Sequence, residues 1–378
     1  MQDLILIVLA VFCAAALALH LASAVLVAAR LRRAKVAPAM PRVLPQITLL
    51  RPVCGLDPLD AETLGSSFGL DYPTHEVIFC AASADDPVVP LIHRLIAAHP
   101  GTRARLMIGE DRITTNPKLN NLAKGWAAAR SDWIVMADSN LLLPPDYLRT
   151  LVAAWTPGTG LVSSPPVGIR PQGLWGAVEC AFLNAYQARW QLAADQVGLG
   201  FAQGKTLFWN RKILDYAGGL AALGAEIAED VNATKLVRAA GLNVRLTPQP
   251  FAQPIGQRSF AEVWGRQLRW ARVRRLGFPA LFVPEVLTGA VAPMAALTAV
   301  VAAGAAPLAS LPAYALVWYG TEAALARGAG WSMGPRDLAA ALLRDLMIPA
   351  VWTWAWAGRD FVWRGNTMAA PARPATPV

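Results

Sequence analysis

The sequence predicts an α/β fold in which a mostly parallel sheet, flanked by helices, lies between an N-terminal transmembrane helix and C-terminal transmembrane helices. Three observations support this prediction. Of the 378 residues, 55% are hydrophobic and 16% are charged, whereas about a quarter are charged in an average soluble domain. The apolar surplus is concentrated near the two ends of the chain. Between those ends, strand-like and helix-like runs alternate, which is typical of βαβ units.

The first apolar segment, residues 4–29, contains no acid, lysine or arginine. A bilayer core needs about 20 apolar residues per helix, so this segment predicts one span. The preceding Met1-Gln2-Asp3 lacks the basic region of a signal peptide, and the apolar run is too long for one. We therefore expect an anchor that is retained.

Further apolar segments follow toward the other end. Residues 286–325, in which Glu322 is the sole charged residue, are long enough for two spans. Residues 338–357 are a weaker candidate, interrupted by Arg344 and Asp345, and either cross the membrane or lie in its interface. We predict four regions: an anchor with a basic stop over 1–35, a cytoplasmic domain with interfacial helices over 36–285, two or three transmembrane segments over 286–358, and a tail over 359–378.

The net charge is +9, from 34 basic and 25 acidic residues, and the basic excess lies beside the apolar segments. Basic residues that flank spans mark the cytoplasmic side, so we expect an integral membrane protein whose central domain faces the cytoplasm. Nucleic acid is not an expected partner, because no basic run is interleaved with aromatic residues. The four cysteines and four histidines lack the spacing of zinc ligands. The basic flanks are Arg30, Arg32, Arg33 and Lys35, and Arg266, Arg269, Arg272, Arg274 and Arg275.

Strands and helices alternate through the central region. The sequence predicts strands at residues 47–53, 76–82, 105–108, 133–137, 160–165, 206–210 and 243–246. It predicts helices at residues 60–68, 88–99, 119–130, 173–194, 228–240 and 260–275. Ligands of parallel sheets bind beyond the carboxyl ends of the strands, so the residues that follow each strand are the candidates for chemistry.

The predicted helix at residues 173–194 carries an apolar stripe. Two interpretations remain open: the helix packs in the core, or it lies in the membrane interface beside the site, where an amphiphilic substrate enters. The stripe consists of Leu174, Val178, Phe182 and Tyr186, with Trp175 and Trp190 nearby.

Acids follow two of the predicted strands. Asp138, in Asp138-Ser139-Asn140, is held by a rigid strand end where it can meet a cation or a ribose. The alternative is a plain turn signal. Asp85 and Asp86 follow another strand, where a carboxylate can accept hydrogen bonds from a base or a ribose. The alternative is that one of them caps the next helix.

Helix positions complete the set of candidates. Lys118 begins a predicted helix, where a lysine and backbone amides can bind phosphate. Asp230 begins another, whose dipole stabilises the carboxylate as a proton acceptor. Arg266, Arg269 and Trp270 share one helix face, which suits a diphosphate and a sugar or acceptor. The alternatives are a solvated lysine, an ordinary acid in a first helical turn, and a basic helix on anionic lipid.

In this order, Asp86, Asp138, Asp230 and the element Arg266-x-x-Arg269-Trp270 resemble the D, D, D, (Q/R)-x-x-R-W signature of membrane-bound inverting glycosyltransferases of the GT-A fold. The surrounding sequence is similar to the ceramide glucosyltransferase family over nearly the whole chain. Each motif is short, but the ordered set is specific. The motifs are Leu50-Arg51-Pro52, Gly55-x-Asp57-Pro58, Leu70-Asp71-Tyr72-Pro73, Asp85-Asp86-Pro87, Asn116-Pro117-Lys118-x-Asn120-Asn121-Leu122 and Ala228-Glu229-Asp230.

The resemblance implies a GT-A type, Rossmann-like catalytic domain. Its implied reaction transfers a hexose, glucose above all, from a UDP-sugar to the primary hydroxyl of ceramide with inversion, giving a β-glycosylceramide. It makes Asp230 the general base and places Asp138 on the diphosphate through Mg²⁺ or Mn²⁺. The other implied contacts are Arg51, Pro52, Asp85, Asp86 and Lys118 on the donor, Arg266, Arg269 and Trp270 on the leaving diphosphate and acceptor, and Gln187 and Trp190 on the acceptor side.

Two positions depart from the family pattern. Asn140 stands where many GT-A enzymes have the second acid of D-x-D, and Gln187 stands where animal members carry a histidine. The alternatives are a hopanoid or diacylglycerol acceptor and, in a different class, an inactive membrane-anchored scaffold that binds a nucleotide-sugar. The Ala-rich and Arg-rich composition suggests a bacterial member in the inner membrane.

Overall fold

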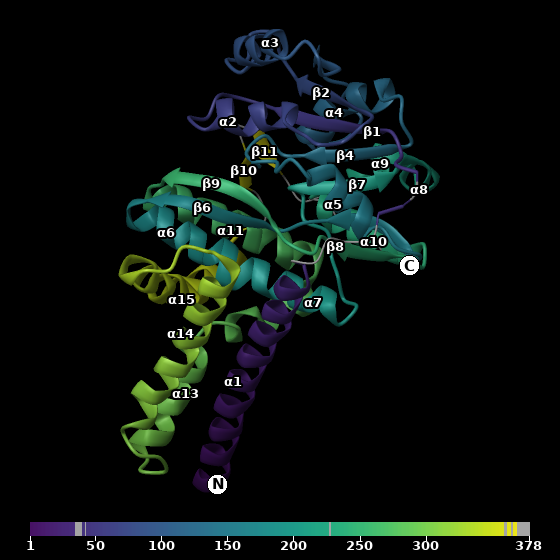
Figure 1. The fold of residues 1–378 in the computed structure, drawn as a ribbon. Helices are drawn as coiled ribbons and strands as arrows, with labels where there is room; N and C mark the ends of the chain where they lie inside the picture. The colour runs from purple at the N-terminus through teal and green to yellow at the C-terminus, as the bar shows by residue number, and fades with distance from the viewer. Residues whose placement is uncertain (35–39, 42, 227, 359–360, 364–365, 369–378) are drawn as a thin grey trace. The chain divides into compact units, whose positions relative to one another are not determined.

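The computed structural model describes residues 1–34, 40–41, 43–226, 228–358, 361–363 and 366–368. Most of the predicted tail therefore lies outside the described residues. The chain forms two compact units, whose elements are labelled in Figure 1. The sheet unit comprises Ala34–Val167, Ala194–Pro254 and Arg359–Val378, and the helical unit comprises Met1–Arg33, Gly168–Ala193 and Ile255–Gly358.

Among the described residues, a mixed sheet forms the sheet unit from β1 (Ile47–Val53), β2 (His75–Ala81), β3 (Ala104–Ile108), β4 (Trp133–Ala137), β5 (Thr159–Ser163), β7 (Thr206–Asn210) and β8 (Asn243–Leu246). The strand order is β3-β2-β1-β4-β7-β5-β8. β1, β2, β3 and β4 are mutually parallel, and β8 is parallel to β5. β7 is antiparallel to both of its neighbours, β4 and β5. The predicted α/β class with a mostly parallel sheet is confirmed.

Helices cover both faces of this sheet. Alternate side chains of each strand point to opposite faces, so each face has its own apolar side chains for helices to pack against. Leu49 and Phe79 belong to the core that includes α3 (Val89–Ala98) and α5 (Tyr147–Ala154). Leu50 and Ile78, one position away, belong to the core that includes α4 (Pro117–Ala128), α9 (Gly219–Leu223) and α10 (Glu229–Ala239). The remaining helical segments of the unit are α2 (Asp60–Gly65), η1 (Ser66–Phe68) and α8 (Arg211–Tyr216).

Two short sheets lie outside the main one. β6 (Pro166–Gln172) pairs with β9 (Phe251–Gln257), and each of these strands has residues in both units. β10 (Phe361–Trp363) pairs in antiparallel fashion with β11 (Asn366–Met368). These four strands were not predicted, whereas the predicted strands of the main sheet differ from the observed ones by at most two residues at either end.

The helical unit contains a bundle of three apolar helices, α1 (Gln2–Arg33), α13 (Val291–Ala302) and α14 (Ser310–Ala329). Cys13, Leu297 and Trp318 lie in their shared core, and the helices run side by side in Figure 1. The rest of the unit is built from α6 (Gly173–Ala181), η2 (Phe182–Ala188), the first half of α7 (Arg189–Gln196), α11 (Phe260–Gly277), α12 (Pro279–Phe282), η3 (Val283–Leu287) and α15 (Pro335–Trp356).

The candidate spans differ from the expected ones. Among the described residues, α1 and α15 are long and apolar enough to cross a membrane, and Pro279–Leu287 with Val291–Ala302, bent by 46°, can form a third span. Within the described residues, this bent pair overlaps the start of the region 286–325, where two spans were expected, and α14 (Ser310–Ala329) is not among the candidate spans. α13 has 12 residues, or about 18 Å of helix, against a bilayer core of about 30 Å. α14 is long enough, but Glu322 and Arg327 lower its hydropathy. The interrupted segment that ranked lower in the sequence is the better candidate.

The apolar stripe of the predicted 173–194 helix packs inside the helical unit. Val178, Phe182 and Tyr186 are buried together with Val263 of α11 and Met347 of α15. The core-packed interpretation is therefore the correct one for these three side chains. Leu174, at the start of the stripe, is exposed.

Charged side chains of the helical unit form a buried cluster. Arg344 of α15 is 1% exposed and donates to both carboxylate oxygens of Glu322 in α14 at 3.0 Å. It also bonds Asp345 at 2.8 Å, and Tyr319 donates to the other oxygen of Asp345 at 2.9 Å. This ion cluster joins α14 to α15, because each acid reaches the same guanidinium.

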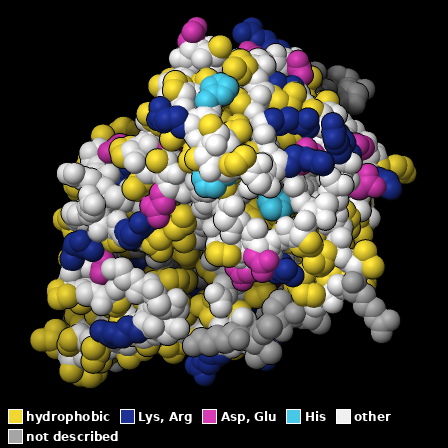
Figure 2. All heavy atoms as spheres, turned by 45° about the horizontal axis from the view of Figure 1, so that its top comes forward, with side chains coloured by type: hydrophobic (Ala, Val, Ile, Leu, Met, Phe, Trp, Pro, Cys, Tyr) yellow, Lys and Arg dark blue, Asp and Glu magenta, His cyan; other side chains and the backbone are white. Residues whose placement is uncertain are grey.

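The surface of the protein carries both signs of charge. On the face that Figure 2 draws, Lys and Arg side chains are interspersed with Asp and Glu and with uncharged surface.

Candidate active site

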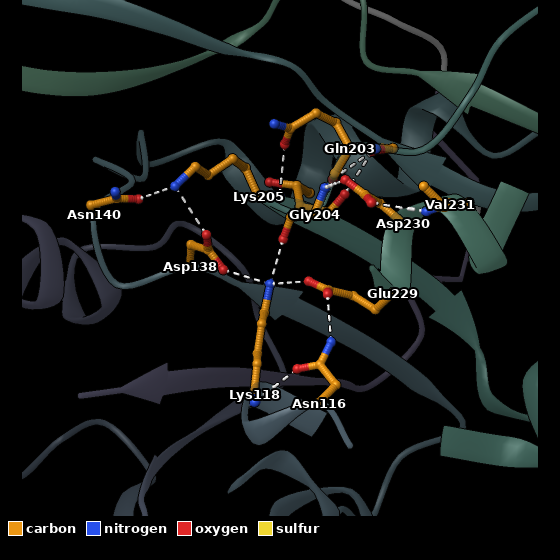
Figure 3. Close-up of polar contacts among 12 residues, drawn as sticks. Asn116, Lys118, Asp138, Asn140, Gln203, Gly204, Lys205, Glu229, Asp230 and Val231 are labelled. Atoms are coloured by element: carbon orange, nitrogen blue, oxygen red, sulfur yellow. Dashed lines mark hydrogen bonds and ion pairs between the residues drawn. The ribbon is translucent and has the colours of Figure 1, made fainter. Parts of the chain in front are cut away.

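Lys118 lies at the centre of a buried polar cluster in the sheet unit (Figure 3). The preceding Asn116 caps α4 by accepting the Lys118 backbone N–H at 2.9 Å, and Pro117 occupies the first helical position. The Lys118 Nζ contacts Asp138 Oδ1 at 2.7 Å and Glu229 Oε1 at 2.7 Å, and it donates to the Gly204 carbonyl at 2.8 Å. Burial alone would lower the pKa of Lys118, but the two carboxylates raise it above its usual value. The cluster therefore holds a charged ammonium.

Asp138 follows β4 directly, at the carboxyl edge of the sheet. Its second oxygen, Oδ2, lies 3.0 Å from the Nζ of Lys205, which also donates to Asn140 Oδ1 at 2.9 Å. Burial alone would raise the pKa of Asp138, but the Lys118 and Lys205 charges outweigh it and hold that pKa well below its usual range. Asp138 is therefore an ionised carboxylate between two ammonium groups.

Asp230 is in the first turn of α10, beside Glu229. Its Oδ2 accepts the Gly204 N–H at 2.9 Å, and its Oδ1 accepts the Val231 N–H at 2.8 Å. Burial and the neighbouring Glu229 charge raise the pKa of Asp230 to about 6, against the opposing effects of these N–H groups and Lys118. A carboxylate with a pKa near neutrality suits a general base.

The structure brings Lys118, Asp138 and Asp230 together. Lys118 bonds both Asp138 and the Gly204 carbonyl, and the N–H of the same glycine holds Asp230 (Figure 3). Glu229 completes the cluster, because its second oxygen accepts the Asn116 side-chain N–H at 3.0 Å. Acids that are far apart in the sequence thus lie in one site at the sheet edge.

Asp85 and Asp86 lie at the same carboxyl edge, after β2. Both oxygens of Asp86 accept the Gly55 N–H at 3.0 Å, and one also accepts the Val88 N–H at 3.0 Å. Asp86 therefore joins the loop after β1 to Val88, the residue before α3, and its side chain stays partly exposed. Because Val88 is the N-cap of α3 and no side chain makes a capping bond there, the capping alternative is not observed. Asp85 is exposed, and its N–H bonds the Ser83 hydroxyl at 3.1 Å.

Arg51, in β1, lies beneath the loop that follows Asp138. Its side chain is fully buried, and its guanidinium donates to the Ser139 carbonyl at 3.0 Å and the Leu141 carbonyl at 3.2 Å. The buried Arg51 side chain therefore supports the loop after Asp138 from beneath, and a contact of Arg51 with the donor stays a prediction. Pro52, beside it in β1, is partly exposed.

Comparison with known proteins identifies the chain. Residues 10–374 match glycosyl transferase family 21. The chain belongs to this family. The resemblance noted in the motifs is therefore confirmed.

Two curated relatives of this family 21 chain are ceramide glucosyltransferases. It is 26% identical over 246 residues to ceramide glucosyltransferase 1 of Caenorhabditis elegans, across 65% of this chain and 53% of that one. It is 40% identical over 111 residues to the ceramide glucosyltransferase of Komagataella phaffii, across 28% of this chain and 22% of that one. The chain thus spans about half the length of the first relative.

A solved structure shares the fold. The mannosyltransferase PcManGT from Pyrobaculum calidifontis, in complex with GDP-Man and Mn²⁺, has a TM-score of 0.53 and 20% identity, covering 89% of this chain and 99% of that one. The likeness supports the GT-A-like arrangement of this family 21 sheet.

The remaining predicted residues of this family 21 chain lie in the helical unit. Arg266 of α11 bonds the buried Glu179 at 2.7 Å. Gln187 donates to Gln267 at 3.0 Å, and Trp270 packs with a small apolar cluster. The Arg189 guanidinium lies 4.9 Å from the ring centre of Trp190, and Arg269 is partly exposed. It stays a prediction that Arg266, Arg269 and Trp270 face the acids Asp138 and Asp230.

Lys205 and Glu229 were not predicted as members of the site. Lys205 directly precedes β7, and because β7 runs antiparallel to β4, its start lies beside the end of β4, where Asp138 follows. The sequence predicted a strand at 206–210 but not its direction. Glu229 had a signal, since it lies next to Asp230 in the Ala228-Glu229-Asp230 motif.

The oxygens around Asp138 do not form an open metal site. Both Asp138 oxygens contact ammonium groups, and the Asn140 oxygen accepts from one of them. Across the described ranges, no group of three or more His, Cys, Asp or Glu side chains could hold a metal ion. The expected Mg²⁺ or Mn²⁺ at Asp138 does not fit these donors while both lysines hold their positions.

Proposed function

We propose that this family 21 protein is a membrane-anchored glycosyltransferase that moves a hexose, glucose in the first instance, from a UDP-sugar to the primary hydroxyl of a ceramide-like lipid, with inversion at the anomeric carbon. The observation that carries the proposal is Asp230, a partly buried carboxylate with a raised pKa beside the Lys118–Asp138 pair. The ceramide glucosyltransferases among its relatives support the choice of acceptor.

The proposed reaction uses Asp230 as the general base. Asp230 removes the proton from the lipid hydroxyl, and that oxygen attacks the anomeric carbon from the face opposite the leaving UDP. The bond from the anomeric carbon to the diphosphate oxygen breaks, and the negative charge moves onto the diphosphate. Positive groups aimed at that charge lower the barrier, since they are fixed before the reaction begins.

Other residues receive proposed roles by their place in the signature. Asp86, with Asp85 and Pro52 beside it, contacts the uridine, and Lys118 and Asp138 lie near the diphosphate. Arg51 positions the loop that follows Asp138. Arg266, Arg269 and Trp270 hold the leaving group and the acceptor region, with Gln187 and Trp190 on the acceptor side. No metal ion is given a role, because the Asp138 oxygens are already bonded to lysines.

The membrane supplies the lipid acceptor in this proposal. The apolar helices α1 and α15 are candidate spans, and the basic residues Arg30, Arg32 and Arg33 end α1. A basic helix end favours the cytoplasmic side. The catalytic domain therefore faces the cytoplasm, in a bacterial cell at the inner membrane.

The experiment presents several acceptors and donors to the purified full-length chain. Ceramide, diacylglycerol and a hopanoid are each incubated with UDP-glucose, UDP-galactose or UDP-N-acetylglucosamine, and glycolipid products are identified by mass spectrometry. We expect a hexosylceramide of β configuration. If product forms only on diacylglycerol or only on the hopanoid, that lipid replaces ceramide as the proposed acceptor. UDP binding without any product would indicate the inactive scaffold.

The pH profile tests the base. Asp230 accepts a proton only as a carboxylate, and its pKa is raised to about 6. We therefore expect kcat/KM to fall about tenfold per pH unit below that pKa and to be level above it. Initial rates between about pH 4.5 and about pH 8 check this, with protein integrity followed by circular dichroism. A flat profile with intact protein would remove Asp230 from the base role.

Gly204→Ala tests how tightly the site is packed. An added Cβ would lie 2.9 Å from Glu229 Oε1 and 3.4 Å from Asp230 Oδ2. Since the Glu229 carboxylate must shift and Lys118 with it, we expect transfer to slow by about tenfold. The matched control is Gly101→Ala, whose Cβ meets no atom within 4 Å. Equal rates for the two variants would contradict the expected crowding.

A further inference from the structure

Lys205 bonds the oxygens that a D-x-N sequence would offer to a metal ion. Its Nζ lies 3.0 Å from Asp138 Oδ2 and donates to Asn140 Oδ1 at 2.9 Å (Figure 3). The other Asp138 oxygen lies 2.7 Å from Lys118 Nζ. One carboxylate therefore holds two ammonium groups.

A divalent cation at the same oxygens would meet both ammonium charges. Protein-bound Mg²⁺ lies about 2.0–2.1 Å from its oxygen ligands and uses one or two carboxylates together with substrate phosphates. Bound to Asp138, the cation would lie close to both ammonium nitrogens, and their two repulsions would oppose the attraction of the one carboxylate. Binding a metal ion would therefore require Lys205 to leave both oxygens.

We propose that the Lys205 ammonium takes the place of a divalent cation at Asp138 and Asn140, so that a nucleotide diphosphate binds this site without a metal ion. The inference rests on the proposed function, whose donor carries that diphosphate. Asp138 then positions two ammonium groups instead of a metal.

The two lysines differ in their surroundings. Lys118 is fixed, because it bonds Asp138, Glu229 and the Gly204 carbonyl, and its side chain is 7% exposed. The Lys205 side chain is 13% exposed, and it lies in the loop that contains Gly204, the glycine that bonds Asp230. Lys205 is therefore the ammonium that we assign to the phosphate oxygens, while Lys118 keeps Asp138 and the Asp230 loop in register.

The test measures UDP binding to the full-length protein in detergent by isothermal titration calorimetry, once with EDTA and once with MnCl₂. We expect the dissociation constant to agree within about twofold between the two conditions. Lys205→Met removes the charge and keeps the length of the side chain, so UDP should bind about 10-fold to 100-fold more weakly. UMP, which lacks the second phosphate, should bind Lys205→Met and the unaltered protein within about threefold of each other.

Two controls separate the outcomes. Lys212→Met removes an exposed lysine that pairs with Asp132 on the surface, and it should leave UDP binding unchanged. Lys205→Arg keeps the charge and should retain most of the affinity. UDP binding by the unaltered protein that weakens at least about tenfold in EDTA would overturn the inference and leave the transferase proposal standing. If UDP binds neither with EDTA nor with MnCl₂, both the inference about Lys205 and the transferase proposal are overturned.

Discussion

Replacing Asp230 with asparagine is expected to slow transfer by about 100-fold to 10,000-fold, the usual contribution of a general base, while UDP binding changes little. Asparagine keeps the size of the side chain and can still accept the Gly204 N–H through its carbonyl oxygen. It cannot take the proton from the lipid hydroxyl. The effect should therefore appear in kcat and not in the affinity for the nucleotide.

Single-turnover rates and UDP titrations on the same preparation check this expectation. Asp132→Asn is a matched control, because Asp132 is an exposed acid of the same unit that pairs with Lys212. The variant should also lose the pH dependence assigned to Asp230. Near-normal turnover of Asp230→Asn would exclude this carboxylate as the base, and a parallel loss of UDP binding would indicate a structural role.

Arg344→Leu is expected to destabilise the helical unit by about 3–5 kcal/mol, the usual effect of breaking a buried ion pair from one side. Arg344 is 1% exposed and bonds both Glu322 and Asp345. Without the guanidinium, two buried carboxylates lose the cation that bonds them both. The loss should appear as a lower midpoint of thermal unfolding in detergent.

The charge of the ion cluster, more than its volume, should cause this loss. Arg327→Leu is the control on α14, because Arg327 is exposed. Exchanging Arg344, Glu322 and Asp345 together for leucine should recover part of the stability, since it also removes the two carboxylates that the single variant leaves without this guanidinium. An unchanged midpoint for Arg344→Leu alone would contradict the expectation.

Local sequence patterns predicted much of the fold. Apolar runs of four to seven residues, followed by turn residues, predicted the strands that became β1, β4, β7 and β8 with their observed bounds. The capping sequence before Lys118 and the acids that begin α10 predicted two helix starts. These features could be predicted from the sequence because propensity, capping and periodicity depend on neighbours within one or two turns.

The candidate spans of the structure differ from the predicted ones for a related reason. An uninterrupted apolar stretch at 286–325 satisfied a length rule, but the chain divides it into the 12-residue α13 and an α14 that contains Glu322. Glu322 meets Arg344 from a segment that looked too polar to be a good span. Hydropathy counts each charge by itself, whereas the folded chain pairs them.

By itself, the sequence determined the α/β class, the apolar anchor, the family and the acids Asp138 and Asp230 at element ends. Only the tertiary structure decided which cations those acids meet. The antiparallel direction of β7 brings Lys205 to Asp138, Lys118 reaches Glu229 across 111 positions of sequence, and burial makes Arg51 a support for a loop. Ion pairs of this kind depend on strand order and direction, which local periodicity does not encode, because the same alternating pattern fits a parallel or an antiparallel neighbour.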